Sequence, residues 1–194
     1  MAVIMSELKV LIEASARHVH VTREHLEALF GDGAALENVR DLSQPGEFLS
    51  DKKLRIEGPR GAIDRVSILG PVRPATQAEV SMTDARVLGV TPFLRESGDV
   101  AGSAPLKITG PAGSVDLAEG CIVAKRHVHL TPEVARKHGL ENKQLISVKI
   151  DGERGVTFHE VVCRVSEKFS PAVHIDYDEA NAVMLTGEVY GTVV

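Results

Sequence analysis

The sequence predicts a mainly β protein, either a sandwich or a barrel, organised as two similar subdomains with short helices. Three observations support this class: short segments rich in β-branched residues, Gly and Pro turn signals between them, and an internal repeat. Long amphipathic helical patterns are absent from the sequence. With 194 residues the chain has the length of one large or two small domains, which can bury a core without disulfides.

Six segments have the composition of β-strands and are bounded by turn residues. They are residues 8–14, 53–58, 64–70, 106–110, 144–152 and 159–165. Two short helices are predicted, over residues 23–30 and 132–138. Each follows a threonine suited to the N-cap, Thr22 or Thr131, and ends before a glycine, Gly31 or Gly139.

The internal repeat links the two halves of the chain. Residues 14–24 (ASARHVHVTRE) match 123–133 (VAKRHVHLTPE), residues 54–61 match 148–155, and residues 79–85 match 174–180. A repeat of this size indicates two similar subdomains related by a pseudo-twofold axis. We expect residues 1–117 to form the first, including a connecting hairpin over about 95–117, and residues 118–194 to form the second.

Each repeat contains a pair of histidines with one residue between them. Alternate residues of a strand face the same side, so each pair presents two imidazoles together. The first position of the third match supplies a third ligand in each repeat. Zinc and similar divalent metals accept neutral imidazole, and a catalytic site has three protein ligands. The predicted ligand sets are His18, His20 and Glu79 in one repeat and His127, His129 and His174 in the other. A single H-x-H pair is more often a surface feature, but two copies in matching contexts favour metal binding.

Three arginines lie near these motifs. Arg73 lies six residues before Glu79, in a segment whose Pro74 favours extended backbone. A guanidinium beside a metal is suited to bidentate capture of phosphate or carboxylate, although a solvated side chain is the alternative. Arg17 and Arg126 precede the histidine pairs and face the other side of a flat strand, so we expect structural roles for them.

Composition excludes several classes of protein. The net charge of −5, the absence of Trp and the aromatic content of 4% argue against nucleic-acid binding. No apolar run reaches the length of a membrane helix, and the N-terminus lacks a secretory pattern. Cys121 and Cys163 are the two cysteines, which fits a reducing compartment. The glycine-rich turns match no nucleotide-binding fingerprint.

Several longer motifs together resemble one known family. They are S-x-R-H-V-H at 15–20, L-S-Q-P-G-E-F at 42–48, G-P-x-R-x-x-T-Q-x-E at 70–79, S-G-D at 97–99, R-H-V-H-L-T-P at 126–132 and H-I-D-Y-D-E-A-N-A at 174–182. The chain resembles the phosphate propanoyltransferases (PduL-type phosphate acyltransferases), and the motifs cover almost its whole length in the order of that family.

This resemblance implies a fold, a reaction and a set of roles. The fold would be two small β-barrels capped by short helices, with two zinc ions between them. The reaction would reversibly convert a short-chain acyl-CoA and phosphate to an acyl phosphate and coenzyme A, by direct attack of phosphate on the thioester. The six predicted ligands would hold the two zinc ions, and Arg73 would hold phosphate. No residue can be assigned to coenzyme A.

The N-terminal residues provide an expectation about the location of the protein in the cell. Many members of the family carry an amphipathic extension that directs them into a bacterial microcompartment. About a dozen strand-like residues precede the first histidine motif here, so we expect a cytoplasmic enzyme without that extension. Propanoyl-CoA and acetyl-CoA are equally compatible substrates, and formation of a homo-oligomer is not readable from the sequence.

Two other interpretations stay open. A bicupin-like metal-dependent oxygenase or isomerase would use the H-x-H-x-x-x-E pattern. Its ligands would be His18, His20 and Glu24, with His127, His129 and Glu133. Both glutamates, however, lie inside predicted helices, whereas a cupin places its ligand on a strand. A metal-binding structural module would hold the same metals tightly without any turnover.

Overall fold

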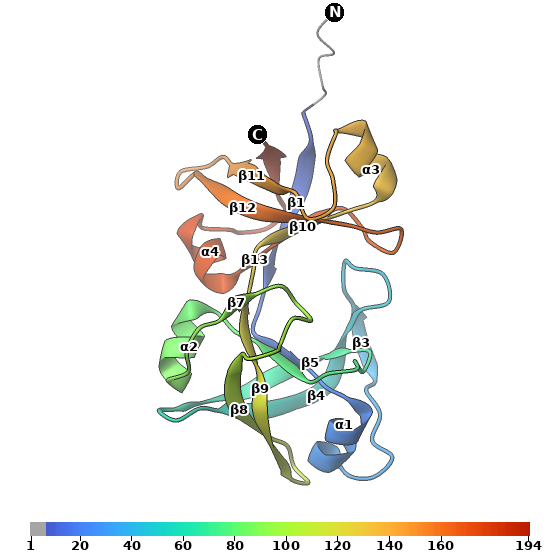
Figure 1. The fold of residues 1–194 in the computed structure, drawn as a ribbon, viewed down its shortest axis with the longest axis vertical. Coiled ribbons are helices and arrows are strands. Elements are labelled where there is room, and N and C mark those ends of the chain that lie inside the picture. Colours follow the sequence, from blue (N-terminus) through green and yellow to red (C-terminus); the bar gives the residue numbers. More distant parts are fainter. Residues whose placement is uncertain (1–6) are drawn as a thin grey trace, which may run out of the picture. The chain divides into compact units, whose positions relative to one another are not determined.

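The computed structural model describes residues 7–194, which form fourteen strands and four short helices. It divides into two compact units, one made of residues 16–42 and 46–124, the other of residues 43–45, 125–194 and the N-terminal segment up to Ser15. Each unit is built on a closed six-stranded β-barrel with two short helices (Figure 1), which confirms the mainly β class.

We call the unit made of residues 16–42 and 46–124 the first barrel. Its elements are β2 (His18–His20), α1 (Arg23–Phe30), β3 (Asn38–Asp41), β4 (Phe48–Glu57), β5 (Ala62–Gly70), β6 (Gln77–Glu79), α2 (Met82–Leu88), β7 (Leu94–Arg95), β8 (Ala104–Thr109) and β9 (Ser114–Ala124). The strands follow the order β4-β5-β2-β6-β9-β8, and β8 pairs back with β4 to close the barrel. The short strands β3 and β7 pair with β4 and β9 outside this ring.

The other unit is the second barrel. Its elements are β1 (Lys9–Ser15), β10 (His127–Leu130), α3 (Pro132–Lys137), β11 (Leu145–Ile150), β12 (Val156–Val165), β13 (Ala172–Asp176), α4 (Tyr177–Ala182) and β14 (Val189–Val193). They close in the order β1-β13-β10-β12-β11-β14.

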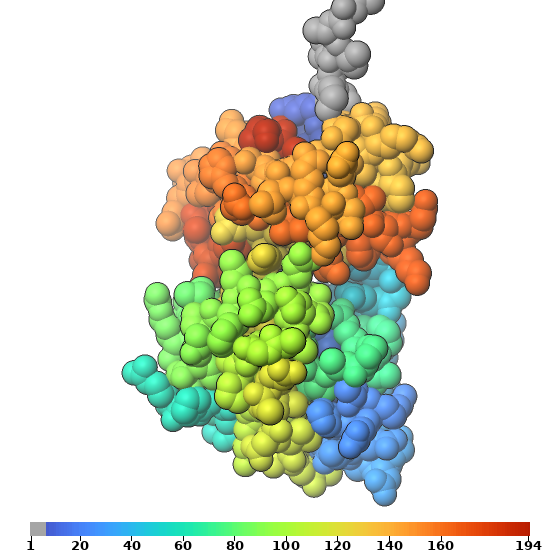
Figure 2. Space-filling model, in the orientation of Figure 1, coloured from blue at the N-terminus to red at the C-terminus, as the bar shows by residue number. Residues whose placement is uncertain are grey.

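The two barrels have the same strand pairings, but they draw one strand from different parts of the chain. In the first barrel, β9 pairs in parallel with β6 and antiparallel with β8. In the second, β1 takes this place, parallel to β13 and antiparallel to β14. In the space-filling view, blue atoms of β1 accordingly lie among the orange and red atoms of the C-terminal part (Figure 2). The boundary predicted at residues 117 and 118 concerns the sequence repeat and stays a prediction, whereas the compact units combine segments that are separate along the chain.

Strand alternation places apolar residues inside each barrel and the predicted ligands on its outer face. Val19 and Val21 of the first barrel, and Val128 and Leu130 of the second, are fully buried in their respective cores. The residues between and before them are the histidines, which therefore point away from the core. Burial of the valines thus fixes the direction of both histidine pairs, since a shift of one residue would expose the valines.

The helices begin at recognisable caps. Thr22 and Thr131 accept hydrogen bonds from the main-chain N–H groups three residues ahead, at 3.1 Å and 3.3 Å, which confirms the predicted α1 and α3. Two further helices, α2 and α4, were not predicted, and each starts with a reciprocal capping box. These boxes are Ser81 with Asp84, and Asp176 with Glu179.

In the first barrel, two hairpin tips pack on helix ends. The N–H of Arg60 donates to the Leu88 carbonyl at the end of α2, and the N–H of Ala112 donates to the Leu29 carbonyl in α1. A Cβ on Gly58 would lie 2.3 Å from that Leu88 oxygen, so glycine is required for this approach. The predicted hairpin within residues 95–117 is present as β8 and the start of β9, where it forms part of the barrel wall.

No helix within residues 7–194 is long and apolar enough to cross a bilayer.

Candidate metal centres

The first predicted ligand set forms one cluster in the first barrel. His18 lies directly opposite Glu79 in the antiparallel pairing of β2 with β6. The Nε2 atoms of His18 and His20 are 3.1 Å apart, and the Nε2 of His18 is 3.6 Å from the Glu79 carboxylate. All three side chains are buried, so two imidazoles and a carboxylate converge away from bulk water.

Main-chain carbonyls select the ring nitrogens that face this cluster. The Nδ1 of His18 is 2.8 Å from the Ala16 oxygen, and the Nδ1 of His20 is 3.3 Å from the Leu69 oxygen. A carbonyl can only accept, so in the neutral rings each Nδ1 carries the proton and each Nε2 presents a lone pair. Two lone pairs facing each other repel unless a proton or a metal cation lies between them, and a divalent metal ion is such a cation.

The charges of the first cluster also suit a metal. Burial alone would raise the pKa of Glu79, but the charge and hydrogen bond of His18 hold it well below its ordinary value. Burial alone would lower the pKa of His18, but Glu79 raises it above its ordinary value. Burial, with the positive charges of His18 and Arg73, lowers the pKa of His20 well below its ordinary value. The carboxylate is therefore ionised and His20 neutral near pH 7, as metal ligation requires.

The second predicted set forms an equivalent cluster in the second barrel. His127 lies opposite His174 in the antiparallel pairing of β10 with β13. The ring centroids are 4.7 Å apart for His127 and His129, 5.2 Å for His127 and His174, and 4.9 Å for His129 and His174. The Nδ1 of His127 is 2.8 Å from the Lys125 oxygen, which reproduces the arrangement of His18.

His129 provides the test of whether this cluster fits a metal ion. Both of its ring nitrogens are buried and have no hydrogen-bond partner among the residues that the structure describes. A buried polar atom without a partner is costly, and the cost disappears when the atom ligates a metal. Burial, with His127 and His174 beside it, lowers the pKa of His129 to about 2. The ring is thus neutral at every physiological pH and available as a ligand.

Both predicted ligand sets are thus brought together: the ligand atoms of each set lie within 4.8 Å of one another. They can hold two divalent ions, one in each barrel.

Sequence reasoning missed a second layer of polar groups around Glu79. The Gln77 amide donates to the Glu79 carboxylate at 2.6 Å and to the Ser97 hydroxyl at 3.1 Å. The oxygen of the same amide accepts from the Gly98 N–H at 2.7 Å. Gln77 therefore fixes the carboxylate and ties the loop around residue 97 to it. Both residues lie in motifs quoted for the resemblance, but no pattern in the sequence indicated that they touch.

Arg73, the predicted phosphate-binding residue, lies beside Gln77 and Ser97. Its guanidinium donates to the Glu47 carboxylate at 2.7 Å and to the Ser97 hydroxyl at 3.3 Å. Its main-chain N–H donates to the Val21 carbonyl at 2.9 Å, so the loop is anchored to the end of the histidine strand. The side chain is 28% exposed, which leaves an anion access to it. Glu47 was missed as its partner.

Two groups flank the second cluster. The Nε2 of His174 is 3.0 Å from the carboxylate of Glu13 on β1, and the hydroxyl of Ser43 donates to the same carboxylate. The hydrogen bond with His174, together with that of Ser43, lowers the pKa of Glu13 despite partial burial. Ser43 belongs to one of the quoted motifs, whereas Glu13 lies in none of them.

The arginines that precede each histidine pair have the structural contacts expected of them. Arg17 contacts Asp84 at 2.9 Å, and Arg126 contacts Glu179 at 2.7 Å. Each carboxylate belongs to the capping box of the helix that follows the third ligand. Both arginines therefore connect the histidine strand to that helix.

The geometry does not support the bicupin interpretation. Glu24 and Glu133 lie in the first turns of α1 and α3, where both are exposed. Neither belongs to the ligand clusters, whose third members are Glu79 and His174.

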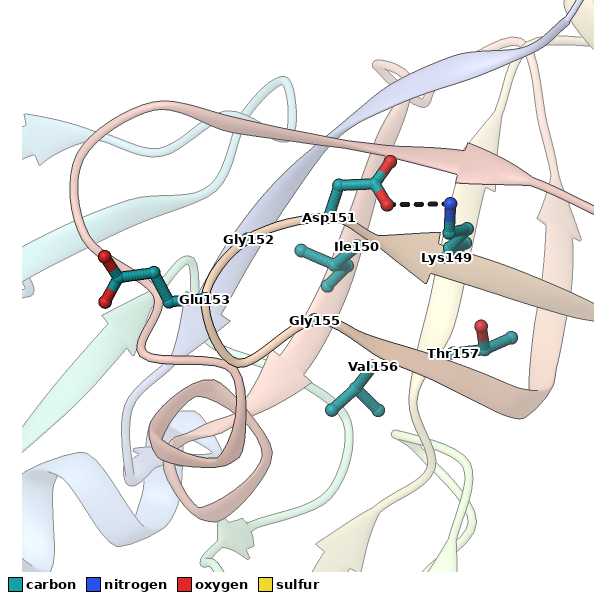
Figure 3. A pocket seen from close by; sticks show the side chains of 8 residues that line it. All are labelled: Lys149, Ile150, Asp151, Gly152, Glu153, Gly155, Val156 and Thr157. Atoms are coloured by element: carbon teal, nitrogen blue, oxygen red, sulfur yellow. Dashed lines mark ion pairs between the residues drawn. The ribbon is translucent and has the colours of Figure 1, made fainter.

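A shallow hollow of about 400 Å³ lies at the tip of the β11–β12 hairpin. It is lined by Lys149, Ile150, Asp151, Gly152, Glu153, Gly155, Val156 and Thr157 (Figure 3). The Lys149 ammonium pairs with Asp151 at 2.7 Å, while Glu153 extends on the other side of the turn. None of the predicted ligands lines this hollow. A Cβ on Gly152 would meet no described atom within 4 Å, whereas a Cβ on its repeat partner Gly58 would clash with Leu88 of α2.

Comparison with known proteins gives a consistent result. A family model described as "Phosphate propanoyltransferase" matches residues 11–186. A phosphate propanoyltransferase of Enterococcus faecalis is 46% identical over 183 residues, which cover 94% of this chain and 87% of that protein. One of Listeria monocytogenes is 46% identical, covering 97% of this chain and 88% of the relative. One of Lachnoclostridium phytofermentans is 48% identical, with 90% and 82% covered.

Proposed function

The chain belongs to the phosphate propanoyltransferase family, and we propose that it transfers a short acyl group between coenzyme A and inorganic phosphate. In this reaction an oxygen of phosphate attacks the thioester carbonyl. A C–O bond forms, the C–S bond breaks, and the thiolate of coenzyme A leaves and takes up a proton. The reverse reaction uses the same groups. The products are an acyl phosphate and free coenzyme A.

One observation supports this function most directly: Arg73 shares its hydrogen-bond partners with a candidate metal ligand. The guanidinium donates to Ser97, Ser97 accepts from Gln77, and Gln77 donates to Glu79. A guanidinium suited to phosphate is therefore linked by two side chains to a carboxylate suited to a metal. An anion bound at Arg73 would lie beside the cluster that handles the reacting oxygen atoms.

The chain supplies orientation and charge rather than a nucleophile. At neutral pH phosphate is itself nucleophilic, so the protein has to hold it and neutralise developing charge. Burial raises the pKa of Cys121 to about 12 and that of Cys163 to about 11, so neither forms a thiolate near pH 7. Arg73 would hold phosphate by its fork of N–H donors, in place of one contact now made to Glu47.

The two histidine clusters would hold two zinc ions. His18, His20 and Glu79 would ligate one, and His127, His129 and His174 the other. When bound, zinc supplies Lewis acidity toward a carbonyl or phosphate oxygen and toward the departing thiolate. With three protein ligands, each ion would keep a coordination position for a substrate atom, as a catalytic zinc site requires.

Release of free thiol tests the proposal directly. Acetyl-CoA and propanoyl-CoA are each supplied with and without phosphate, before and after chelation and again after zinc is added back. We expect release that requires phosphate, is lost on chelation and returns with zinc, and the ratio of the two rates identifies the preferred acyl group. Supplying acyl phosphate and coenzyme A tests reversibility.

A folded, zinc-loaded protein that releases no thiol from either substrate would overturn the proposal in favour of a structural metal-binding module. Oxygen consumption with iron or manganese would instead favour the cupin-like alternative. The cytoplasmic location expected from the sequence stays a prediction.

A further inference from the structure

The two barrels differ at one position beside the third ligand. In the first barrel, Glu79 of β6 pairs with Ile122 of the parallel strand β9. In the second, His174 of β13 pairs with Glu13 of the equivalent strand β1. Where the first barrel has a carboxylate beside an apolar residue, the second has an imidazole beside a carboxylate. At this paired position each barrel therefore has one carboxylate, but on different strands.

The contact between Glu13 and His174 determines which ring nitrogen remains available. The Nε2 of His174 lies 3.0 Å from the Glu13 carboxylate, an acceptor, so this nitrogen carries the proton. Only Nδ1 of His174 is then free to bind a metal ion. His127 is fixed in the opposite sense, because its Nδ1 donates to the Lys125 carbonyl and leaves Nε2.

Glu13 is not itself part of the ligand cluster. Among the described residues, the group whose ligand atoms lie within 4.8 Å of one another contains His127, His129 and His174 without it. A carboxylate one hydrogen bond behind a ligating histidine sets the orientation and tautomer of the ring and makes it a better donor. Removal of such a partner weakens metal binding roughly 10- to 100-fold.

The carboxylate of Glu13 is itself held in place. The Ser43 hydroxyl donates to the same oxygen that faces His174. The neighbouring Gln44 is buried and exchanges two hydrogen bonds with the main chain of Ser170, at 3.0 Å and 3.2 Å. Residues 43–45, which belong to the second unit, are thereby anchored where Ser43 meets Glu13.

We propose that Glu13 is a positioning residue of the second metal centre. It holds His174 with Nδ1 toward the metal and supplies, one hydrogen bond away, the negative charge that Glu79 supplies directly to the first centre. Ser43 keeps the carboxylate in that position. This inference rests on the proposed function in so far as His127, His129 and His174 hold zinc.

The test compares Glu13→Ala, Glu13→Gln and Ser43→Ala in the full chain, with Glu153→Gln as the matched control. Glu153 lies in the same barrel but contributes no contact to the cluster. Two quantities are measured: the dissociation constants of both zinc ions by chelator competition, and the tautomer of His174 from ¹⁵N shifts of the zinc-free protein.

We expect Glu13→Ala to weaken zinc binding at the second centre roughly 10- to 100-fold and to leave zinc binding at the first centre unchanged. His174 should then become a mixture of tautomers. Glu13→Gln retains an acceptor oxygen, so it should keep the Nε2–H tautomer and weaken that zinc less. Ser43→Ala should have a smaller effect of the same sign, and the control none.

An unchanged His174 tautomer and unchanged zinc constants in Glu13→Ala would overturn the inference. An equal loss of affinity for both zinc ions would also overturn the inference, because such a loss would indicate a general structural effect. A wild-type chain that binds no zinc at this cluster overturns the metal role of both proposals. The tautomer of His174 then reports separately whether the bond to Glu13 forms.

Discussion

The two candidate metal centres are built on the same strand pairing and differ in how a carboxylate reaches them. In the first barrel Glu79 is itself a member of the cluster, fixed from behind by the neutral amide of Gln77. In the second barrel His174 takes that place and the carboxylate of Glu13 stands behind it. One backbone arrangement thus carries two chemically different sites.

This difference predicts unequal metal ions. A carboxylate ligand cancels one positive charge of a bound zinc directly, whereas three neutral imidazoles leave both charges and a more electrophilic ion. Glu13 would act through its hydrogen bond to His174, so it would reduce the effective positive charge of the second ion without taking a coordination position. We therefore expect the second centre to be the stronger Lewis acid of the two.

Removal of one metal centre at a time should have the largest effect. His127→Ala should reduce bound zinc from two ions per chain to one and lower turnover about 1000-fold, because metal catalysis supplies several kcal/mol. His18→Ala should remove the other ion. Elemental analysis and the thiol-release assay measure both effects, with His159→Ala, an exposed histidine in the second barrel, as control. Full activity in either metal-depleted variant would contradict a two-zinc mechanism.

Arg73 distinguishes phosphate binding from metal binding at the first centre. Arg73→Ala should lower kcat/KM for phosphate about 100-fold, the effect of losing one preorganised charged donor, while both zinc ions remain. Arg73→Lys should recover part of the loss, since a lysine supplies the charge without the planar fork. Steady-state kinetics at varied phosphate and zinc analysis provide the readouts. Arg55→Ala, which removes an exposed arginine paired with Asp64, should change neither. Loss of zinc from Arg73→Ala would refute the assigned role.

Gln77 is specific to the first centre, because its counterpart in the second barrel is Ala172. Gln77→Ala removes the amide hydrogen bond to Glu79 and the contacts of the same amide with Ser97 and Gly98. We expect the first zinc ion to bind roughly 30-fold more weakly while the second is unaffected. Chelator competition measures both constants, and Gln144→Ala, an exposed glutamine, serves as control. Equal weakening of the two ions would show that the effect is not local.

In the zinc-free protein two histidines with shifted pKa values, His129 and His18, should change the stability with pH in opposite directions. The pKa of His129 is about 2 in the folded protein, against an ordinary value of 6.5, so below pH 6.5 the unfolded chain binds an additional proton. Stability from this residue therefore falls with falling pH, by up to about tenfold in the unfolding constant per pH unit. The raised pKa of His18 contributes in the opposite sense: its pairing with Glu79 stabilises the folded state below pH 6.5 and is lost as the pH rises.

Urea titrations of the chelated protein at pH 6.5 and 5.5, followed by circular dichroism, measure this dependence. His129→Leu should remove much of the loss in stability between the two pH values, because leucine takes up no proton. A variant as acid-sensitive as the wild type would show that His129 is not the responsible group.

The internal repeat made the candidate ligands predictable, whereas contacts between distant segments were missed. Both H-V-H pairs and both third ligands were predictable because each motif occurs twice, and the register confirms that His18 meets Glu79 and that His127 meets His174. The partnership of Glu13 and His174 spans 161 residues and joins two parallel strands. No local pattern records such a contact, since a carboxylate in an amphipathic strand usually faces water.

The missed helices have a different explanation. The helices α2 and α4 contain only seven and six residues, too few for an amphipathic period to become visible. Their capping boxes at Ser81 and Asp176 were the available signal. The exchange of β1 for β9 was not predictable, because nothing in the composition of a strand indicates which barrel it completes.

The position of β1 has a consequence for the order in which the protein is made. During synthesis β1 emerges before every strand of the first barrel, whereas its partners β13 and β14 emerge after them, so β1 stays unpaired while the first barrel is translated. All strands of the first barrel lie between residues 16 and 124, and this barrel can close earlier. The first barrel can therefore fold while β1 is still unpaired. The open edge of β1, which is prone to pairing with other chains, is covered only after β13 and β14 have been synthesised.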